Sequence, residues 1–199
     1  EFLFECCGDG HIFGVDASKG LLSINLTVIP VTMTSVQIQF ASHSLFICPT
    51  ATKIVRFQFT EPFAVLDSYE FETQICRFFV SDSLQALCVL DNMGLVSVFS
   101  LCSKKLTAKY MADGSFFDVS ILEPWGYILL RSMDSLVALS INGEYVNSID
   151  ISQNWYVTMF STVENNAFVV LQDITNQLSI IDLVDGKVHS TIDFPQRTC

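Results

Sequence analysis

The sequence is poor in charge. Only 16% of its 199 residues are Asp, Glu, Lys or Arg, against roughly 25% in an average soluble domain. Lysine and arginine together number 10 and the acidic residues 21, so the formal net charge is −11. This shortage of cations argues against a nucleic-acid partner, because a phosphate-binding face starts from a surplus of Lys and Arg. Half of the residues are apolar, which excludes disorder, collagen and an extended coiled coil.

Long uninterrupted apolar runs are also missing. The stretch 20–52 contains no Asp, Glu, Lys or Arg, but Asn25, Pro30 and His43 interrupt it. A membrane helix needs about 20 mostly apolar residues in a row, so we expect strands here and no direct insertion into a membrane. The chain begins with Glu1 and shows no signal peptide. We therefore expect it to be cut from a longer protein.

The seven cysteines form neither a CxxC pair nor a Cys/His cluster at zinc spacing. They occupy positions 6, 7, 48, 76, 88, 102 and 199, and four of them lie within apolar runs. Free cysteine is a good small core residue, so we expect reduced, buried thiols in a cytoplasmic protein. The sequon Asn25-Leu26-Thr27 lies in an alternating strand pattern and is interpreted as chance.

Five segments repeat a β-rich run, a polar turn and a second β-rich run. Their equivalent positions are Ile12, Ile54, Val96, Leu136 and Leu178, separated by 42, 42, 40 and 42 residues. A period of about 40–45 residues made of strands and turns, without helical periodicity, is typical of β-propeller blades. Blades stack face to face, so both faces of each sheet are buried and the strands need few charges.

The third and fourth repeats each show four strands. We expect them at 74–80, 85–90, 95–100 and 106–110, and at 116–121, 127–131, 136–141 and 145–149. Asn142-Gly143 predicts a two-residue type I′ hairpin, in which both residues have positive φ. Asp185-Gly186 closes the corresponding hairpin of the fifth repeat, Asp91 to Gly94 and Gly8 to Gly10 form the turn one strand earlier, and Gly20 lies in a looser connection.

The sequence therefore predicts an all-β fold, a β-propeller arc of four-stranded antiparallel blades over residues 1–199. We place a partial blade at 1–30 and blades at about 31–70, 71–112, 113–152 and 153–194. The first repeat lacks its opening strand. A five-bladed ring would need that strand from 193–199, which contains Pro195, a residue suited only to a sheet edge. An arc cut from a larger ring of about seven blades is the preferred interpretation.

The chain resembles WD-repeat propellers in a degenerate form. The Trp-Asp dipeptide of that family falls on Val15-Asp16, Phe57-Gln58, Phe99-Ser100, Leu139-Ser140 and Ile181-Asp182. A bulky apolar residue is kept in every repeat, while its partner is acidic in only two. The hydrogen-bonded tetrad of strong WD repeats cannot be assembled from these residues, so we expect packing to hold the blades together.

The carboxyl-terminal half also resembles the terminal propeller of BEACH-domain proteins. The likeness rests on Pro124-Trp125-Gly126-Tyr127-Ile128, on Ser135-Leu136, on Leu139 to Glu144, and on Trp155 to Thr158 opening the next blade. The resemblance implies a non-catalytic protein-interaction scaffold at the carboxyl end of a large cytoplasmic protein of membrane trafficking. It implies other proteins as partners, no cofactor, and peripheral attachment to membranes through the full-length chain.

No set of residues predicts catalysis or a metal site. His11, His43 and His189 lie in different repeats without a second ligand nearby. No Gly-x-Ser-x-Gly elbow is present, and the turn at Gly8 to Gly10 lacks the lysine and helix of a phosphate site. Asp113 and Asp118 could pair as carboxylates, but a turn residue and a strand-edge residue are the simpler interpretation.

Two groups of side chains are candidates for surface contacts. Lys104, Lys105 and Lys109 form the one basic cluster, interpreted as a solvated hairpin edge that discourages aggregation. Phe116-Phe117 and Trp155-Tyr156 are candidates for exposed anchors, although packing between blades is the preferred interpretation. The partner-binding residues therefore stay undetermined by the sequence.

Two other classes of protein stay open. A propeller enzyme would carry a metal or quinone in the central channel and would need His, Asp or Glu at one phase of several repeats, which the repeats do not show. A propeller scaffold of another large complex, such as a vesicle coat or tether or a nucleic-acid-processing assembly, would lack a BEACH domain upstream.

Overall fold

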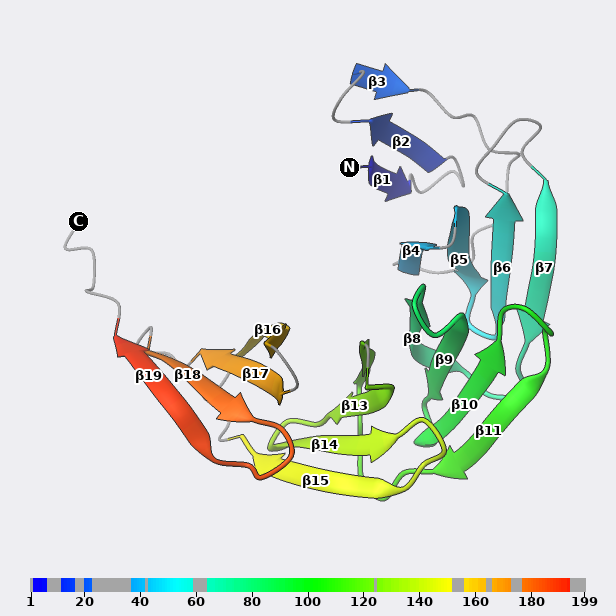
Figure 1. The fold of residues 1–199 in the computed structure, drawn as a ribbon. Helices are drawn as coiled ribbons and strands as arrows, with labels where there is room; N and C mark the ends of the chain where they lie inside the picture. The colour runs from blue at the N-terminus through cyan, green and yellow to red at the C-terminus, as the bar shows by residue number, and fades with distance from the viewer. Residues whose placement is uncertain are drawn as a thin grey trace. The chain divides into compact units, whose positions relative to one another are not determined.

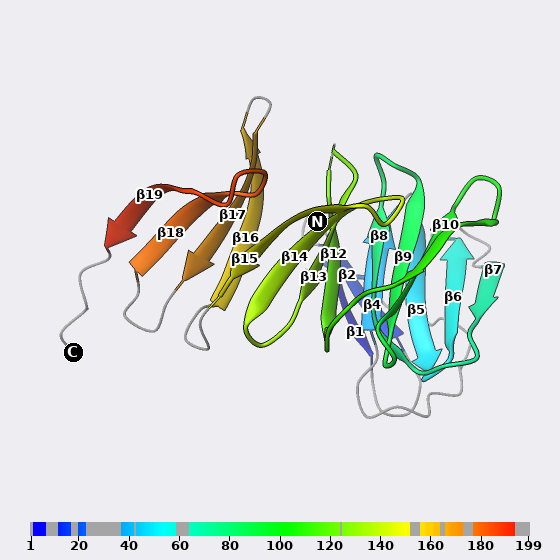
Figure 2. The same ribbon diagram turned by 90° about the horizontal axis from the view of Figure 1, so that it is seen from below.

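The structure is a computed structural model (Figures 1 and 2). It describes residues 2–6, 12–16, 20–22, 37–41, 43–58, 64–123, 125–151, 156–163, 166–172 and 177–193, with the backbone alone in the strands before residue 23 and in 156–166. These residues form strands and turns and contain no helix. In particular, no helix long and apolar enough to cross a membrane occurs among them.

The chain divides into two compact units, Glu1–Ile75 and Cys76–Cys199. The first unit holds a three-stranded sheet made of β1 (Phe2–Cys6), β2 (Ile12–Asp16) and β3 (Gly20–Leu22). It also holds a four-stranded sheet made of β4 (Gln37–Ala41), β5 (Ser44–Thr50), β6 (Lys53–Gln58) and β7 (Val65–Glu70). Three strands in the first repeat were predicted, but Gly20 begins β3 and so does not lie in a loose connection.

The second unit contains three four-stranded sheets in sequence order. The first sheet has β8 (Ile75–Ser81), β9 (Ala86–Asp91), β10 (Leu95–Ser100) and β11 (Leu106–Met111). The second has β12 (Asp118–Leu122), β13 (Tyr127–Arg131), β14 (Ser135–Ser140) and β15 (Tyr145–Asp150). The third has β16 (Tyr156–Val163), β17 (Asn166–Gln172), β18 (Gln177–Asp182) and β19 (Val188–Asp193). Every neighbouring pair of strands is antiparallel.

The strands predicted for the third and fourth repeats are confirmed, with ends that differ by no more than two residues. The largest difference is at β12, which begins at Asp118 instead of Phe116. Strand β9 is buried along its whole length, whereas the outer strands β11, β15 and β19 are largely exposed. Each sheet is therefore buried most completely near its middle and exposed at its outer edge.

Neighbouring sheets of the second unit share apolar cores. One cluster joins the sheet of β8–β11 to the sheet of β12–β15 and includes Cys88, Leu90 and Leu130. The other joins the sheet of β12–β15 to that of β16–β19 and includes Leu129 and Val169. Because successive residues of a strand point to opposite faces, Leu129 and Leu130 of β13 enter different cores. The middle sheet is thus buried on both faces, as the low charge of the sequence predicts.

The hairpin at Asn142-Gly143 differs from its prediction. Gly143 has φ +88°, as expected, but Asn142 is not among the residues of positive φ. The Gly143 N–H donates to the Ser140 carbonyl over 2.9 Å, and the Ser140 N–H donates to the Glu144 carbonyl over 2.7 Å. The β14–β15 pairing also shifts register between Ala138 and Leu139. This is a three-residue loop with a bulged glycine, not a two-residue type I′ turn.

The outer hairpins of the first and third sheets of this unit share a different loop. The Lys104 N–H donates to the Ser100 carbonyl over 2.8 Å, and the Gly186 N–H donates to the Asp182 carbonyl over 2.9 Å. Both residues lie in the left-handed region, with φ +61° at Lys104 and +70° at Gly186. Lys104 therefore holds at the strained position of its loop the conformation that glycine takes in the other.

Replacing Lys104 by glycine should raise the free energy of unfolding by about 0.5–1 kcal/mol. Glycine removes a left-handed penalty of roughly 1–2 kcal/mol but adds roughly 0.5–1 kcal/mol of unfolded-chain entropy. Urea unfolding of the variant measures the difference. The reverse change at the equivalent site, Gly186→Lys, should lower stability. A destabilised Lys104→Gly variant would contradict the strained conformation.

The described cysteines Cys48, Cys76, Cys88 and Cys102 are free thiols. Cys48 and Cys88 are buried, Cys76 is half-buried and Cys102 is exposed. Burial raises the pKa of the Cys48 thiol to about 11 and raises that of Cys88 as well. The predicted reduced thiols are thus confirmed for these four, although Cys102 is not buried. Cys7, Cys199 and the sequon at Asn25 lie outside the described residues.

The raised thiol pKa values predict loss of stability at alkaline pH. Up to about pH 8 the thiols are protonated in both states and add no pH dependence. From the ordinary pKa of 9.0 up to about 11, unfolded Cys48 loses a proton that the folded chain keeps. The free energy of unfolding should then fall by as much as about 1.4 kcal/mol per pH unit for each such group. Urea unfolding at pH 8, 9 and 10 measures this slope.

A matched pair of variants isolates the thiol contribution to that slope. Cys88→Ala should make the decline of stability between pH 9 and 10 shallower, because it removes one buried group with a raised pKa. Cys102→Ala should leave the decline unchanged, because Cys102 is exposed. Equal slopes in the two variants would show that the burial of Cys88 does not control its titration.

Candidate functional site

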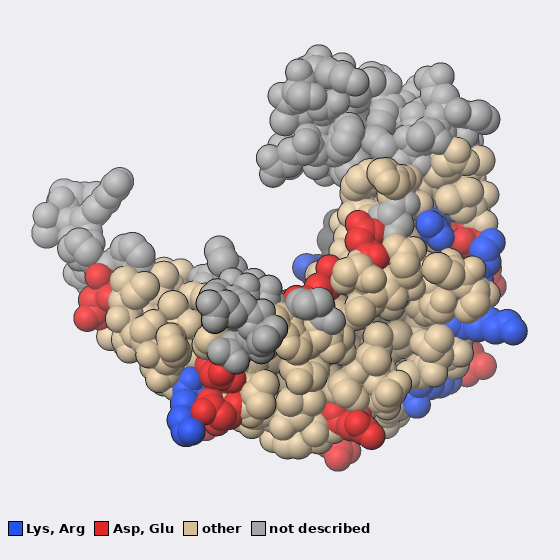
Figure 3. All heavy atoms as spheres, viewed as in Figure 1, with Lys and Arg blue, Asp and Glu red and all other residues tan. Residues whose placement is uncertain are grey.

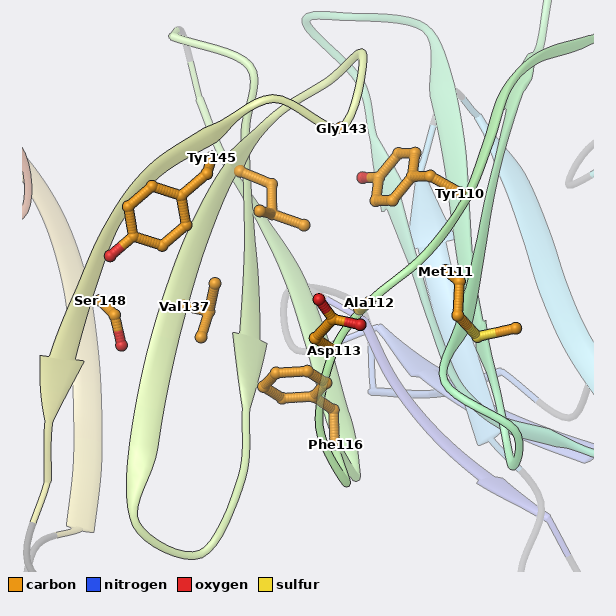
Figure 4. A pocket seen from close by; sticks show the side chains of 10 residues that line it. Tyr110, Met111, Ala112, Asp113, Phe116, Val137, Gly143, Tyr145 and Ser148 are labelled. Atoms are coloured by element: carbon orange, nitrogen blue, oxygen red, sulfur yellow. The ribbon is translucent and has the colours of Figure 1, made fainter.

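A pocket opens between two neighbouring sheets of the second unit (Figure 4). Its volume is about 370 Å³. One wall comes from the end of β11 and the segment that follows it, and the other from β14, β15 and the loop between them. The lining residues are Tyr110, Met111, Ala112, Asp113, Phe116, Val137, Leu139, Gly143, Tyr145 and Ser148.

The register of the strands explains why these side chains meet. Val137 and Leu139 alternate along β14 and point to the same face of its sheet. This face meets the preceding sheet, because Leu139 belongs to the core that the two sheets share and Val137 packs against it. Gly143 then lies against the ring of Tyr110, since a Cβ built on Gly143 would be only 2.5 Å from Tyr110 Cδ1. The loop after β14 can close on β11 only because residue 143 has no side chain.

The rim of the pocket carries two large exposed side chains. Met111 is 59% exposed at the end of β11, and Tyr145 is 66% exposed at the start of β15. Single exposed apolar residues need no explanation on a protein surface. Here, however, they stand on opposite walls of one opening, as Figure 4 shows. The pocket therefore offers an incoming chain an apolar contact on each side.

Asp113 supplies the only charged group among the lining residues. It is exposed on the segment between β11 and β12, and its carboxylate has no ion-pair partner within the described part of the chain. Asp118, the other predicted carboxylate, forms an ion pair with Arg77, with Arg77 Nε 3.1 Å from Asp118 Oδ1. The two carboxylates thus have different surroundings and do not act as a pair.

The hydroxyl of Tyr110 is a second unpaired polar group at the pocket. The oxygen is buried and has no hydrogen-bond partner. Burial, with a smaller contribution from Cys88, raises the pKa of Tyr110, so this phenol stays protonated through the neutral range. In Figure 4 the hydroxyl points across the gap toward β14. An unpaired buried hydroxyl is unfavourable for folding and marks this wall as imperfectly packed.

The aromatic anchors predicted from the sequence divide into two environments. Phe116 is buried in the core between the two sheets and forms the floor of the pocket. Phe117 is exposed, and the Arg131 guanidinium lies 5.4 Å from its ring centroid. Packing between blades was the preferred interpretation for both, and it is confirmed for Phe116 alone. Trp155 lies outside the described residues, as does the side chain of Tyr156.

The remaining candidates lie away from this pocket. Lys104, Lys105 and Lys109 are exposed on the β10–β11 hairpin, which confirms the predicted solvated edge. His43 ends the turn before β5, and the His189 ring lies 5.3 Å from that of Phe168. Within the described ranges no three His, Cys, Asp or Glu residues gather as a metal site would require. His11 and the turn at Gly8 to Gly10 lie outside those ranges.

The pocket could not be found from the sequence, because its walls come from segments about 25 residues apart. The composition does contain one usable signal, which is the low number of cations. The charged groups in Figure 3 form small separate patches on a mostly uncharged surface. An unpaired carboxylate such as Asp113 is therefore without a nearby cation to neutralise it.

Antiparallel four-stranded sheets, stacked through shared cores and repeated along the chain, define a β-propeller fold. Solved propeller structures are similar to this chain. BamB from Moraxella catarrhalis matches 85% of the chain and 54% of its own length, with a TM-score of 0.61 and 11% identity. The dihydro-heme d1 dehydrogenase NirN, solved in complex with DHE, matches 97% of the chain and 44% of its own length, with a TM-score of 0.63 and 14% identity.

The chain thus spans about half the length of these two structures. Their low identity shows a common fold alone, since unrelated functions occur on one fold. No protein-family model and no curated protein sequence matches the chain.

Proposed function

We propose that this chain is a non-catalytic protein-interaction platform, the propeller region of a BEACH-type membrane-trafficking protein that works in the cytoplasm. The observation that supports the platform is the pocket between two blades, with its exposed rim of Met111 and Tyr145 and its unpaired Asp113. Rigid sheets that present variable loops are a suitable frame for recognition. Its occupant would be another protein, and no cofactor or nucleic acid takes part.

The trafficking assignment is supported by the hairpin that carries part of the BEACH likeness. Its glycine, Gly143, has the positive φ that an Ile-Asn-Gly loop requires of its last residue. The reading frame that encodes this chain should also encode a BEACH domain upstream. A complete frame without such a domain would refute the trafficking assignment and would favour a scaffold of another large complex.

The interaction role has its own test. The whole chain, fused to a proximity-labelling enzyme in cells, should label a reproducible set of proteins. A chain with Ser148→Trp, which fills the pocket from an exposed strand position, should lose part of that set. If the wild-type chain labels no proteins above background, the proposed platform is wrong.

The second candidate is a propeller enzyme, favoured by the similarity to the dehydrogenase NirN. An enzyme of this kind would need a cofactor and inward-facing ligands at the same phase in several repeats. A bound chromophore that copurifies with the chain would support this candidate against the interaction platform.

A further inference from the structure

We infer that the pocket between the two blades binds a basic side chain, preferably arginine, from an extended segment of a partner protein. The inference rests on the proposed interaction function and names the chemistry that its site would recognise. Three properties of the pocket carry it: an apolar wall, aromatic rings near the opening and one unpaired carboxylate.

The shape and polarity of the pocket suit a long amphipathic side chain. Arginine and lysine bury an apolar stem while the charged end seeks a polar partner. Val137 and Leu139 of β14 form an apolar wall for the stem. The volume of about 370 Å³ is large enough for such a side chain together with some of its backbone.

The charged end of the side chain meets its partners in the same opening. Asp113 supplies a carboxylate that no cation in the described part of the chain neutralises. Phe116 lies below it, and Tyr145 stands at the rim (Figure 4). A guanidinium is attracted both to a carboxylate and to aromatic faces. Arginine fits better than lysine because its planar group also stacks on rings.

The charge of the whole chain favours the same partner. A net charge of −11 attracts basic segments and repels acidic ones over a long range. This attraction is not specific, however, so it would bring basic peptides to many parts of the surface. The local test must therefore separate Asp113 from the rest of the acidic residues.

The experiment uses a fluorescently labelled nine-residue peptide, three repeats of Gly-Arg-Ala, and the whole chain. Its matched control replaces each arginine by citrulline, which keeps the shape and removes the charge. Fluorescence anisotropy at low salt should show at least tenfold tighter binding of the arginine peptide. Free arginine amide should compete with it only weakly, because a peptide also contacts the apolar rim at Met111 and Tyr145.

Two pairs of variants locate the binding. Asp113→Asn should weaken binding of the arginine peptide about threefold to tenfold, while Asp150→Asn should change it less than twofold. Asp150 is an exposed aspartate of β15 outside the pocket, so both variants change the net charge equally. Ser148→Trp should abolish binding, and Ser190→Trp at the equivalent position of β19 should not.

Equal losses in the two aspartate variants would overturn the inference, because they would show general attraction to an acidic surface. Equal binding of the arginine and citrulline peptides would overturn it as well. Either result leaves the interaction platform itself standing if proximity labelling still finds Ser148→Trp-sensitive partners. The two proposals can therefore fail separately.

Discussion

Replacing Gly143 by alanine should lower the free energy of unfolding by about 2–4 kcal/mol. Two costs add at this residue. A side chain at φ +88° is in the left-handed region, which costs roughly 1–2 kcal/mol. A Cβ would also lie 2.5 Å from Tyr110 Cδ1, so the ring or the loop must move, and such overpacking costs roughly 1–3 kcal/mol. Valine should be worse than alanine because it is β-branched. Urea unfolding measures both.

Gly126→Ala is the matched control for the backbone contribution. Gly126 has φ +70°, but a Cβ there would be 3.4 Å from its nearest neighbour, Leu84 Cδ1. The cost at this position should thus be mainly strain, on the order of 1–2 kcal/mol. If Gly143→Ala costs no more than Gly126→Ala, the contact between the loop and Tyr110 is wrong. Gly20 is a poor control, because it begins β3.

Truncation of Leu130 to alanine should destabilise the chain by about 2–5 kcal/mol, the range for a buried leucine that leaves a cavity. Leu130 has no exposed surface and lies in the core that joins the sheet of β8–β11 to that of β12–β15. The cost arises because two separate sheets lose contacts on the same side chain. Thermal or urea unfolding of the variant gives the value.

Leu106→Ala provides the comparison on the neighbouring sheet. Leu106 begins the outer strand β11 and is 47% exposed, so its truncation should cost less than about 1 kcal/mol. Similar losses at the two leucines would mean that the shared core contributes little. The stacking of sheets would then need another explanation.

The sequence predicts the regular parts of this fold well, because they depend on a periodic pattern. The repeat of 40–42 residues places every strand of the third and fourth sheets within two residues. The outer hairpin was harder to predict. Ile141 continues the alternating pattern of β14, so it was counted as the last strand residue. In the structure it belongs to the loop, because Ser140 pairs with Glu144. Both turn types place glycine at positive φ, so the glycine alone cannot distinguish them.

The site depended on information that the sequence does not contain. Phe116 and Phe117 are identical neighbours, yet one enters the core and the other is exposed, since β12 begins only at Asp118. The side to which each ring turns is decided by the path of the segment between two sheets. The same path brings Asp113 opposite β14. Local pattern predicts that a turn exists here, but not which residues it brings together.

The two shared cores imply that the second unit unfolds as a row of coupled elements instead of a single block. In such a row each sheet is stabilised by its own strands and by its neighbours. The sheet of β12–β15 has neighbours on both faces, because Leu129 and Leu130 enter different cores. Its amide hydrogens should exchange with solvent more slowly than those of β17 and β18. Loss of either flanking sheet would then release half of its protection, so damage at one blade would spread to the next.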